Sequence, residues 1–291
     1  MHTDTETAPA SISRRRLFAG AAPAASHAAT SGTPPDAWRW LSKAGFGCTT
    51  ADLAAFDALG SNDAARWTTW IEQQLDPASI DDSDCDNRLA AAGYTTLGKT
   101  LPQLWAQHHS EGDDYSLRML PLTETECATV LRARHSKRQV FERMVGFWHD
   151  HFSVYGNDYD IGPIFVSYDR DVIRPNALGN FRALLGAVAR STAMQYYLDN
   201  YSSVGADFNE NYARELIELH TLGVENYFGP GDPFEVPCLD AHDFRCEGSM
   251  PSGYVDNDVY EAAAALTGWT IRNGDWRYPS ENDGTFTYHA D

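Results

Sequence analysis

The stretch from Asn209 to Leu222 contains the acids whose spacing is best suited to chemistry. As a helix turning by about 100° per residue, it places Glu215 within an apolar stripe and Asn211 and Glu218 along the edge of that stripe. A carboxylate among apolar groups needs a partner or loses its charge. Helical carboxylates three residues apart, such as Glu215 and Glu218, occur in the metal sites of helical bundles. Glu215 is therefore expected to pair with an arginine or with a divalent metal ion that histidine also binds.

Three arginines are candidates for a structural ion pair with this acid: Arg174, Arg182 and Arg214. His220 lies about 140° from Glu215 on the same helix. It is therefore expected to contact a different neighbour, or to stabilise the end of its helix as a cation.

His149 and His151 are the candidate imidazole ligands, and the end of their helix decides what they do. If the helix continues through Phe152, the two rings point about 200° apart and cannot bind one ion. If it ends near Trp148 and the chain becomes extended, both rings lie on one side, which is a workable spacing for two metal ligands.

Two interpretations of these residues remain open. In the first, His149 and Glu215 are catalytic, as general acid and base or as members of a metal site formed by His149, His151, Glu215 and Glu218. In the second, the same groups form buried ion pairs that only fix helix packing. Phosphate-binding loops, nucleophile elbows and His-Glu-x-x-His zinc motifs are absent from the sequence, which offers no nucleophile with a visible activating partner.

The elements that would position these residues are mostly helices. Helices are expected over 36–44, from Thr49 to Gly60 with a Thr49–Asp52 capping box, from 63 to Pro77, over 83–92 and over 101–109, from a Thr123–Glu126 capping box, and over 137–151, 164–174, 177–190, 193–199 and 209–222. The 137–151 helix is too apolar to present a solvent-facing side, so it is expected to be central and buried. After a helix from Asp256 to Leu266, alternating segments around Trp269, Trp276 and Phe286 predict short strands.

Composition excludes several classes of protein. The 291 residues include 43% hydrophobic and 12% aromatic residues, which excludes disorder. A formal charge of −19 argues against a nucleic-acid partner, because phosphate backbones are bound by clustered Lys and Arg. The sequence has no run of about 18 apolar residues, so no transmembrane span is expected.

Residues 1–34 have the pattern of an export signal followed by a linker. Ser13-Arg14-Arg15-Arg16-Leu17-Phe18 precedes a short Ala-rich apolar stretch, and the small residues Ser26 and Ala28 suit cleavage by a signal peptidase. The run resembles a twin-arginine signal, which implies a periplasmic, extracellular or cell-surface location. Cysteines tend to pair in such compartments. Cys238 and Cys246 are a candidate disulfide, Cys85 and Cys127 are a second candidate pair, and Cys48 is left over.

Several separated segments together resemble the bacterial family known as domain of unknown function 1800. They are LSKAGFG (41–47), FWHDHF (147–152), IRPNALGNFR (173–182), YLDN (197–200), NENYARELIELHTLG (209–223), DVYE (258–261) and LTGW (266–269). The resemblance implies an exported helical protein and no established activity. The family's domain is usually longer, so this chain is expected to be its N-terminal part, truncated at the C-terminus.

The sequence thus predicts a mainly α protein, a multi-helix orthogonal bundle with a small β-rich segment at its C-terminal end. Residues 35–291 are expected to form a single helical domain, in which 224–255 are an acidic loop that contains the candidate disulfide. The leading functional hypothesis is an exported hydrolase that uses a buried His/Glu cluster. The alternative is a non-catalytic surface or assembly protein that binds an extracellular polymer or a protein partner through exposed aromatic residues such as Trp269, Trp276 and Tyr278.

Overall fold

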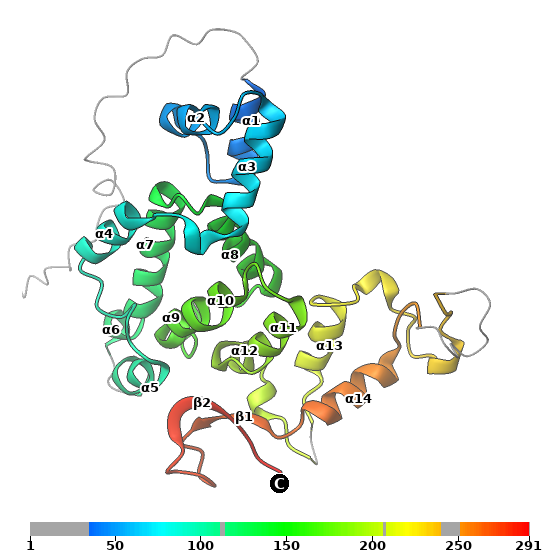
Figure 1. Ribbon diagram of the computed structural model, residues 1–291. Coiled ribbons are helices and arrows are strands. Elements are labelled where there is room, and N and C mark those ends of the chain that lie inside the picture. Colours follow the sequence, from blue (N-terminus) through cyan, green and yellow to red (C-terminus); the bar gives the residue numbers. More distant parts are fainter. Residues whose placement is uncertain (1–34, 111–113, 206–207, 240–250, 291) are drawn as a thin grey trace, which may run out of the picture. The chain divides into compact units, whose positions relative to one another are not determined.

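The computed structural model describes residues 35–110, 114–205, 208–239 and 251–290 (Figure 1). The predicted export signal, residues 1–34, lies outside this part of the chain and stays a prediction. Most described residues are helical, and one small antiparallel sheet lies near the C-terminal end of the chain. The predicted mainly α fold is therefore confirmed. No helix in the described ranges is both long and apolar enough to cross a membrane.

The first three helices form a small aromatic cluster of their own. They are α1 (Asp36–Ala44), α2 (Thr50–Asp57) and α3 (Asp63–Leu75). The predicted Thr49–Asp52 capping box is present, because the Thr49 side chain accepts from the Asp52 N–H and Asp52 accepts from the Thr49 N–H. Phe56 is buried within this cluster, and the rings of Trp67 and Trp70 stack at 5.2 Å.

The next segment leads to the long helix α7. Its elements are η2 (Pro77–Ser79), α4 (Ser83–Ala91), α5 (Leu101–Leu104), a π-helical turn η3 (Trp105–His109), α6 (Tyr115–Arg118) and α7 (Leu120–His135). The start predicted from Thr123 and Glu126 is wrong, since α7 begins at Leu120 with Pro121 in its first turn. Thr123 instead bonds back to the carbonyl of Met119.

Helix α8 (Gln139–Phe152) carries the predicted histidines and is anchored by a buried amide. Gln74 of α3 donates from Nε2 to the Lys137 carbonyl at 2.9 Å and accepts from the Val140 N–H at 3.1 Å. These two bonds satisfy backbone groups at the start of α8. The expectation that this helix is buried all round is wrong, because Phe147 is 52% exposed and another face lines a cavity.

The main hydrophobic core lies between α8 and the helical segments that follow it. These are η4 (Gly162–Ile164), α9 (Phe165–Ser167), a π-helical turn η5 (Tyr168–Ile173), α10 (Arg174–Asn176), α11 (Phe181–Ala189), α12 (Thr192–Tyr197) and η6 (Asn200–Ser202). Among its largest fully buried side chains are Trp105, Phe152, Tyr168 and Tyr212. The core therefore joins α8 to both earlier and later parts of the chain.

The remaining described elements complete the C-terminal part. They are α13 (Asn211–Glu218), η7 (Val224–Asn226), η8 (Pro233–Glu235), α14 (Asp256–Leu266), β1 (Trp269–Asn273) and β2 (Asn282–Tyr288). Helices α13 and α14 pack on each other (Figure 1). The alternating pattern predicted strands here, and the two that form pair Trp269 with Tyr288 and Ile271 with Phe286. The third expected strand is absent from this region, since Trp276 lies in the connection between β1 and β2 and is 84% exposed.

The cysteines separate into free thiols and a candidate pair. Cys48, Cys85 and Cys127 are free, so the second pairing predicted between Cys85 and Cys127 is wrong. Cys238 is not among these free thiols, and its predicted partner, Cys246, lies outside the described residues. The disulfide between Cys238 and Cys246 therefore stays a prediction.

Candidate functional site

One face of α8 forms a wall of the larger cavity, whose volume is about 600 Å³. The α8 residues that line it follow the helical spacing of three and four, and they are Glu142, Val145, Gly146, His149, Asp150 and the adjoining Ser153. Gly146 leaves this wall open, because a Cβ there would meet no atom within 4 Å. The opposite wall includes Thr125 and Thr129 of α7. The cavity thus brings a histidine and several hydroxyl and carboxyl groups to one surface.

His149 is held in this wall by a buried carboxylate. Its Nε2 atom lies 3.0 Å from Oδ1 of Asp169, a residue of the π-helical turn η5 that is 4% exposed. The imidazole also packs against the rings of Phe165 and Tyr168, with centroid distances of 5.6 and 5.5 Å. These contacts fix the orientation of the imidazole.

An arginine pair surrounds Asp169. Nη1 of Arg132 lies 3.8 Å from Asp169 Oδ2, and Nη1 of Arg174 lies 4.0 Å from Oδ1. Arg174 also donates from Nη2 to Glu142 Oε1 at 2.5 Å. Burial by itself would raise the pKa of Asp169, but the hydrogen bond from His149 and the charges of Arg174 and Arg132 lower this pKa below its ordinary value of 3.8. Asp169 is therefore an ionised acceptor.

The ionised carboxylate sets the tautomer of His149. A carboxylate only accepts hydrogen bonds, so Nε2 of His149 carries the proton, and Nδ1 of the neutral ring is left as an acceptor. Within the described residues, Nδ1 is neither hydrogen bonded nor among the buried polar atoms without a partner. Nδ1 is therefore free to accept a proton, and it belongs to a residue that lines the cavity.

His151 does not join His149, because α8 continues through Phe152. The two rings therefore point to different sides of the helix, which is the geometry that excludes one shared ion. Nε2 of His151 faces the carbonyl oxygen of His220 at 3.2 Å, and the two rings are 6.2 Å apart. Burial and the neighbouring His151 lower the pKa of His220 to about 4. His220 thus contacts a neighbour other than Glu215, as expected, but as a buried neutral ring.

Glu215 is only partly enclosed in an apolar surface. Helix α13 ends at Glu218, and Leu219, which the helix predicted over 209–222 includes, is 59% exposed. The Oε2 atom of Glu215 is buried without a hydrogen-bond partner, and burial, followed by the charge of Glu218, raises the pKa of Glu215. No hydrogen bond or ion pair within the described ranges joins Glu215 to His149. The predicted His149–Glu215 pair therefore gains no support from these contacts.

The other residues predicted to support Glu215 do not contact its carboxylate through any hydrogen bond or ion pair in the described part of the chain. Arg214 pairs with Glu210 at 3.1 Å and with Asp256 of α14 at 3.4 Å. Asn211 bonds the carbonyl of Leu198 at 3.5 Å. Arg182 is exposed, and no ion pair involves it in the described part of the chain. Among the three candidate arginines, only Arg174 belongs to the network around His149.

The predicted metal ligands are not gathered into one group. His149 contacts Asp169, His151 contacts a backbone carbonyl, and Glu218 is one turn beyond Glu215 on α13. Across the residues described by the structure, no three His, Cys, Asp or Glu side chains are arranged to hold a metal ion. The arrangement of these side chains therefore gives the predicted metal site no support.

The sequence did not point to Asp169, Arg132 or Glu142 as site residues. Asp169 lies 20 residues from His149 in an irregular turn, which no periodic pattern reveals. A signal was nevertheless present in the 137–151 helix, because the residues without an apolar side chain at 142, 146 and 149 (Glu142, Gly146 and His149) recur at helical spacing. That stripe is the face which lines the cavity.

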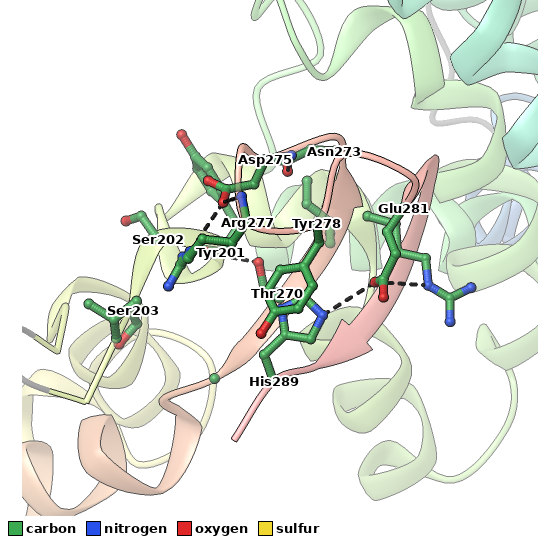
Figure 2. A pocket seen from close by; sticks show the side chains of 14 residues that line it. Tyr201, Ser202, Ser203, Thr270, Asn273, Asp275, Arg277, Tyr278, Glu281 and His289 are labelled. Atoms are coloured by element: carbon green, nitrogen blue, oxygen red, sulfur yellow. Dashed lines mark hydrogen bonds and ion pairs between the residues drawn. The ribbon is translucent and has the colours of Figure 1, made fainter. Parts of the chain in front are cut away.

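A second, smaller cavity of about 180 Å³ lies beside the β1–β2 pair (Figure 2). Its charged groups are paired with each other: His289 faces Glu281 at 3.2 Å, Arg272 faces the same carboxylate at 3.5 Å, and Arg277 bonds Asp275 at 3.1 Å. The Glu281 side chain is 34% exposed, against 6% for the Asp169 side chain, so the His149–Asp169 pair is the more enclosed of the two His–carboxylate pairs.

Comparison with known proteins gives a family. Searches of curated proteins and of solved structures each found no match to the chain. A family model described as "protein of unknown function (DUF1800)" matches residues 39–291. The matched region contains α8, η5 and all residues of the larger cavity. The chain therefore belongs to the DUF1800 family of proteins of unknown function.

Proposed function

We propose that the protein is an exported bacterial hydrolase in which His149 acts as the general base and Asp169 orients it. The observation that carries this proposal is the 3.0 Å contact between His149 Nε2 and Asp169 Oδ1 in the wall of a cavity of about 600 Å³. A histidine in a cavity wall with one ring nitrogen free can take a proton from an attacking nucleophile, typically accelerating a reaction about 10²–10⁴-fold. The buried carboxylate then stabilises the imidazolium that forms.

The charges around His149 support this role. Arg132 and Arg174 are opposed by Asp169 and Glu142, so the network carries no net charge while His149 is neutral. One proton on His149 therefore adds a single positive charge next to an ionised Asp169. This arrangement favours a temporary imidazolium without requiring any other group to move.

The lining of the cavity supports a neutral or cationic substrate. Glu126 and Asp150 are exposed at the cavity, and no ion pair neutralises either of them within the described residues. Unpaired carboxylates repel an anion. The aromatic rings of Phe46, Tyr155 and Phe165 add apolar surface for an uncharged part of the substrate.

Hydrolysis of a panel of chromogenic esters, amides, glycosides and phosphoesters tests the proposal. We expect at least one substrate to be hydrolysed, and we expect His149→Ala to reduce its kcat/KM at least about 100-fold with the melting temperature retained. His109→Gln is the matched control, because His109 faces Asp160 at 3.2 Å and does not line the cavity. The proposal would be contradicted if no substrate of the panel were hydrolysed, or if His149→Ala left the hydrolysis unchanged. Loss of folding in His149→Ala without any activity in the parent protein would favour a structural network.

Export is tested separately. The Ser13-Arg14-Arg15-Arg16-Leu17-Phe18 run supports a twin-arginine route, which carries folded proteins. In a bacterium with this route, we expect Arg14→Lys together with Arg15→Lys to move the protein from the exported to the cytoplasmic fraction. Equal export of the variant and the parent protein would refute this part of the proposal.

A further inference from the structure

Ser153 follows α8 in a backbone conformation that serine rarely adopts. Its φ and ψ are 54° and 26°, in the left-handed region. Only one other non-glycine residue within the described ranges has a positive φ, namely Asp199. Glycine is the usual residue at such a helix end, because a side chain there costs about 1 kcal/mol. The presence of serine therefore calls for a role of its side chain.

That side chain lies in the same cavity wall as His149. The Ser153 N–H donates to the His149 carbonyl at 2.8 Å, so Ser153 stands one helical turn beyond His149. Both residues line the cavity, and Ser153 is exposed. Ser153 follows His149 by four positions and closes the last turn of α8, so the two residues are neighbours at that end of the helix. No hydrogen bond engages the Ser153 hydroxyl in the described part of the protein.

The loop after Ser153 lines the same cavity and contains unused backbone donors. The N–H groups of residues 154–157 form no hydrogen bond within the described residues, and all four residues line the cavity. The loop is held by packing, because Val154 is buried and a Cβ at Gly156 would lie 2.7 Å from Leu122. Fixed N–H groups next to a nucleophile are the usual donors to an oxyanion.

We propose that Ser153 is the nucleophile of this site and that the substrate is a neutral or cationic carboxylic ester or amide. The inference rests on the proposed function and adds the attacking atom to it. Ser153 then completes a Ser-His-Asp arrangement with His149 and Asp169, which sequence order and spacing did not reveal.

The reaction has two halves. His149 Nδ1 takes the Ser153 Oγ proton while Oγ bonds to the carbonyl carbon, and N–H groups of the 154–157 loop stabilise the oxyanion. The intermediate expels the alcohol or amine, which receives the proton from His149, and an acyl-serine remains. Water then attacks the acyl carbon and gives a proton to His149. The carboxylic acid leaves as Ser153 Oγ recovers that proton.

Covalent labelling of the full chain tests the nucleophile. The protein is treated with a fluorophosphonate, and peptide mass mapping locates the phosphonyl group; hydrolysis of a short-chain chromogenic ester is measured in parallel. We expect label on the peptide containing Ser153, and its loss in Ser153→Ala together with at least about a 100-fold loss of hydrolysis. Ser61→Ala, which changes an exposed serine outside the cavity, is expected to keep both the label on Ser153 and the hydrolysis.

Ser153→Gly separates chemistry from folding. Glycine adopts the left-handed conformation without strain, so this variant is expected to melt at an equal or higher temperature while losing both label and hydrolysis. If Ser153→Ala and Ser153→Gly keep a hydrolysis that still depends on His149, water is the nucleophile, and this inference fails while the proposed function stands. If no hydrolysis depends on His149 and Ser153 is not labelled, both fail.

Discussion

The buried ring of His220 should make the protein less stable as the pH falls below about 6.5. Only 4% of His220 is exposed, and its ring lies 5.2 Å from Phe152 and 6.2 Å from His151. Burial, followed by the charge of His151, lowers its pKa from 6.5 to about 4 in the folded state. The other titratable ring that faces it is Tyr212, at 6.4 Å.

The direction and size of the effect follow from these pKa values. As the pH falls through 6.5, the unfolded chain takes up a proton on His220, whereas the folded protein does so only near pH 4. Stability from this residue is therefore complete above pH 6.5 and is lost between pH 6.5 and about pH 4. At about 1.4 kcal/mol for each pH unit, the loss is at most about 3.5 kcal/mol.

Urea unfolding between pH 7 and pH 4 measures this contribution. His220→Gln replaces the ring with a side chain that does not titrate, while the His220 carbonyl that faces His151 is retained. Both proteins share the same carboxylates, so acid effects of those groups cancel in the comparison. We expect the free energy of unfolding of the parent protein to fall by about 2–3 kcal/mol more than that of the variant over this range. Equal losses in the two proteins would refute the reasoning.

Three further outcomes are expected from urea and thermal unfolding. Asp169→Asn removes the carboxylate between two buried arginines and should lower the free energy of unfolding by about 3–5 kcal/mol; a change under about 1 kcal/mol would show that the network is not tightly coupled. Gln74→Ala removes both hydrogen bonds between the Gln74 side chain and the start of α8, and it should lower the free energy of unfolding by about 2 kcal/mol. Gln73→Ala, at the exposed neighbouring position, should change it by almost nothing. Ser153→Gly should raise the stability by about 0.5–1 kcal/mol, and a decrease would indicate that the serine side chain supports the fold.

Local sequence signals located most helices but misplaced some of their ends. The Thr49–Asp52 box marks the true start of α2, because a capping box acts within three residues. The similar pattern at Thr123 and Glu126 failed, since the chain is already helical from Leu120. At α13, the expected apolar stripe extended to residues that are exposed, because the helix ends at Glu218. Tertiary packing decides such boundaries where more than one local pattern is compatible with the sequence.

The candidate site was only partly predictable for the same reason. His149 and Arg174 were found as chemically suited residues, and the alternative geometries of His149 and His151 were stated correctly. The actual partner of His149 is Asp169, on a π-helical turn whose direction depends on the surrounding core. Glu215 has the burial-raised pKa expected of it, but it lacks the expected contact with His149.

The sequence by itself determined the mainly helical fold, two of the three expected C-terminal strands and the family, because periodicity, caps and motif order are properties of neighbouring residues. Only the tertiary structure decided which buried charges meet. Coulombic and hydrogen-bond energies fall off within a few ångströms, so the choice between Asp169 and Glu215 as the partner of His149 depends on how separate helices pack. The same packing places Ser153 in the wall of the cavity with His149. The left-handed backbone conformation of Ser153, in contrast, is a local feature of the end of α8.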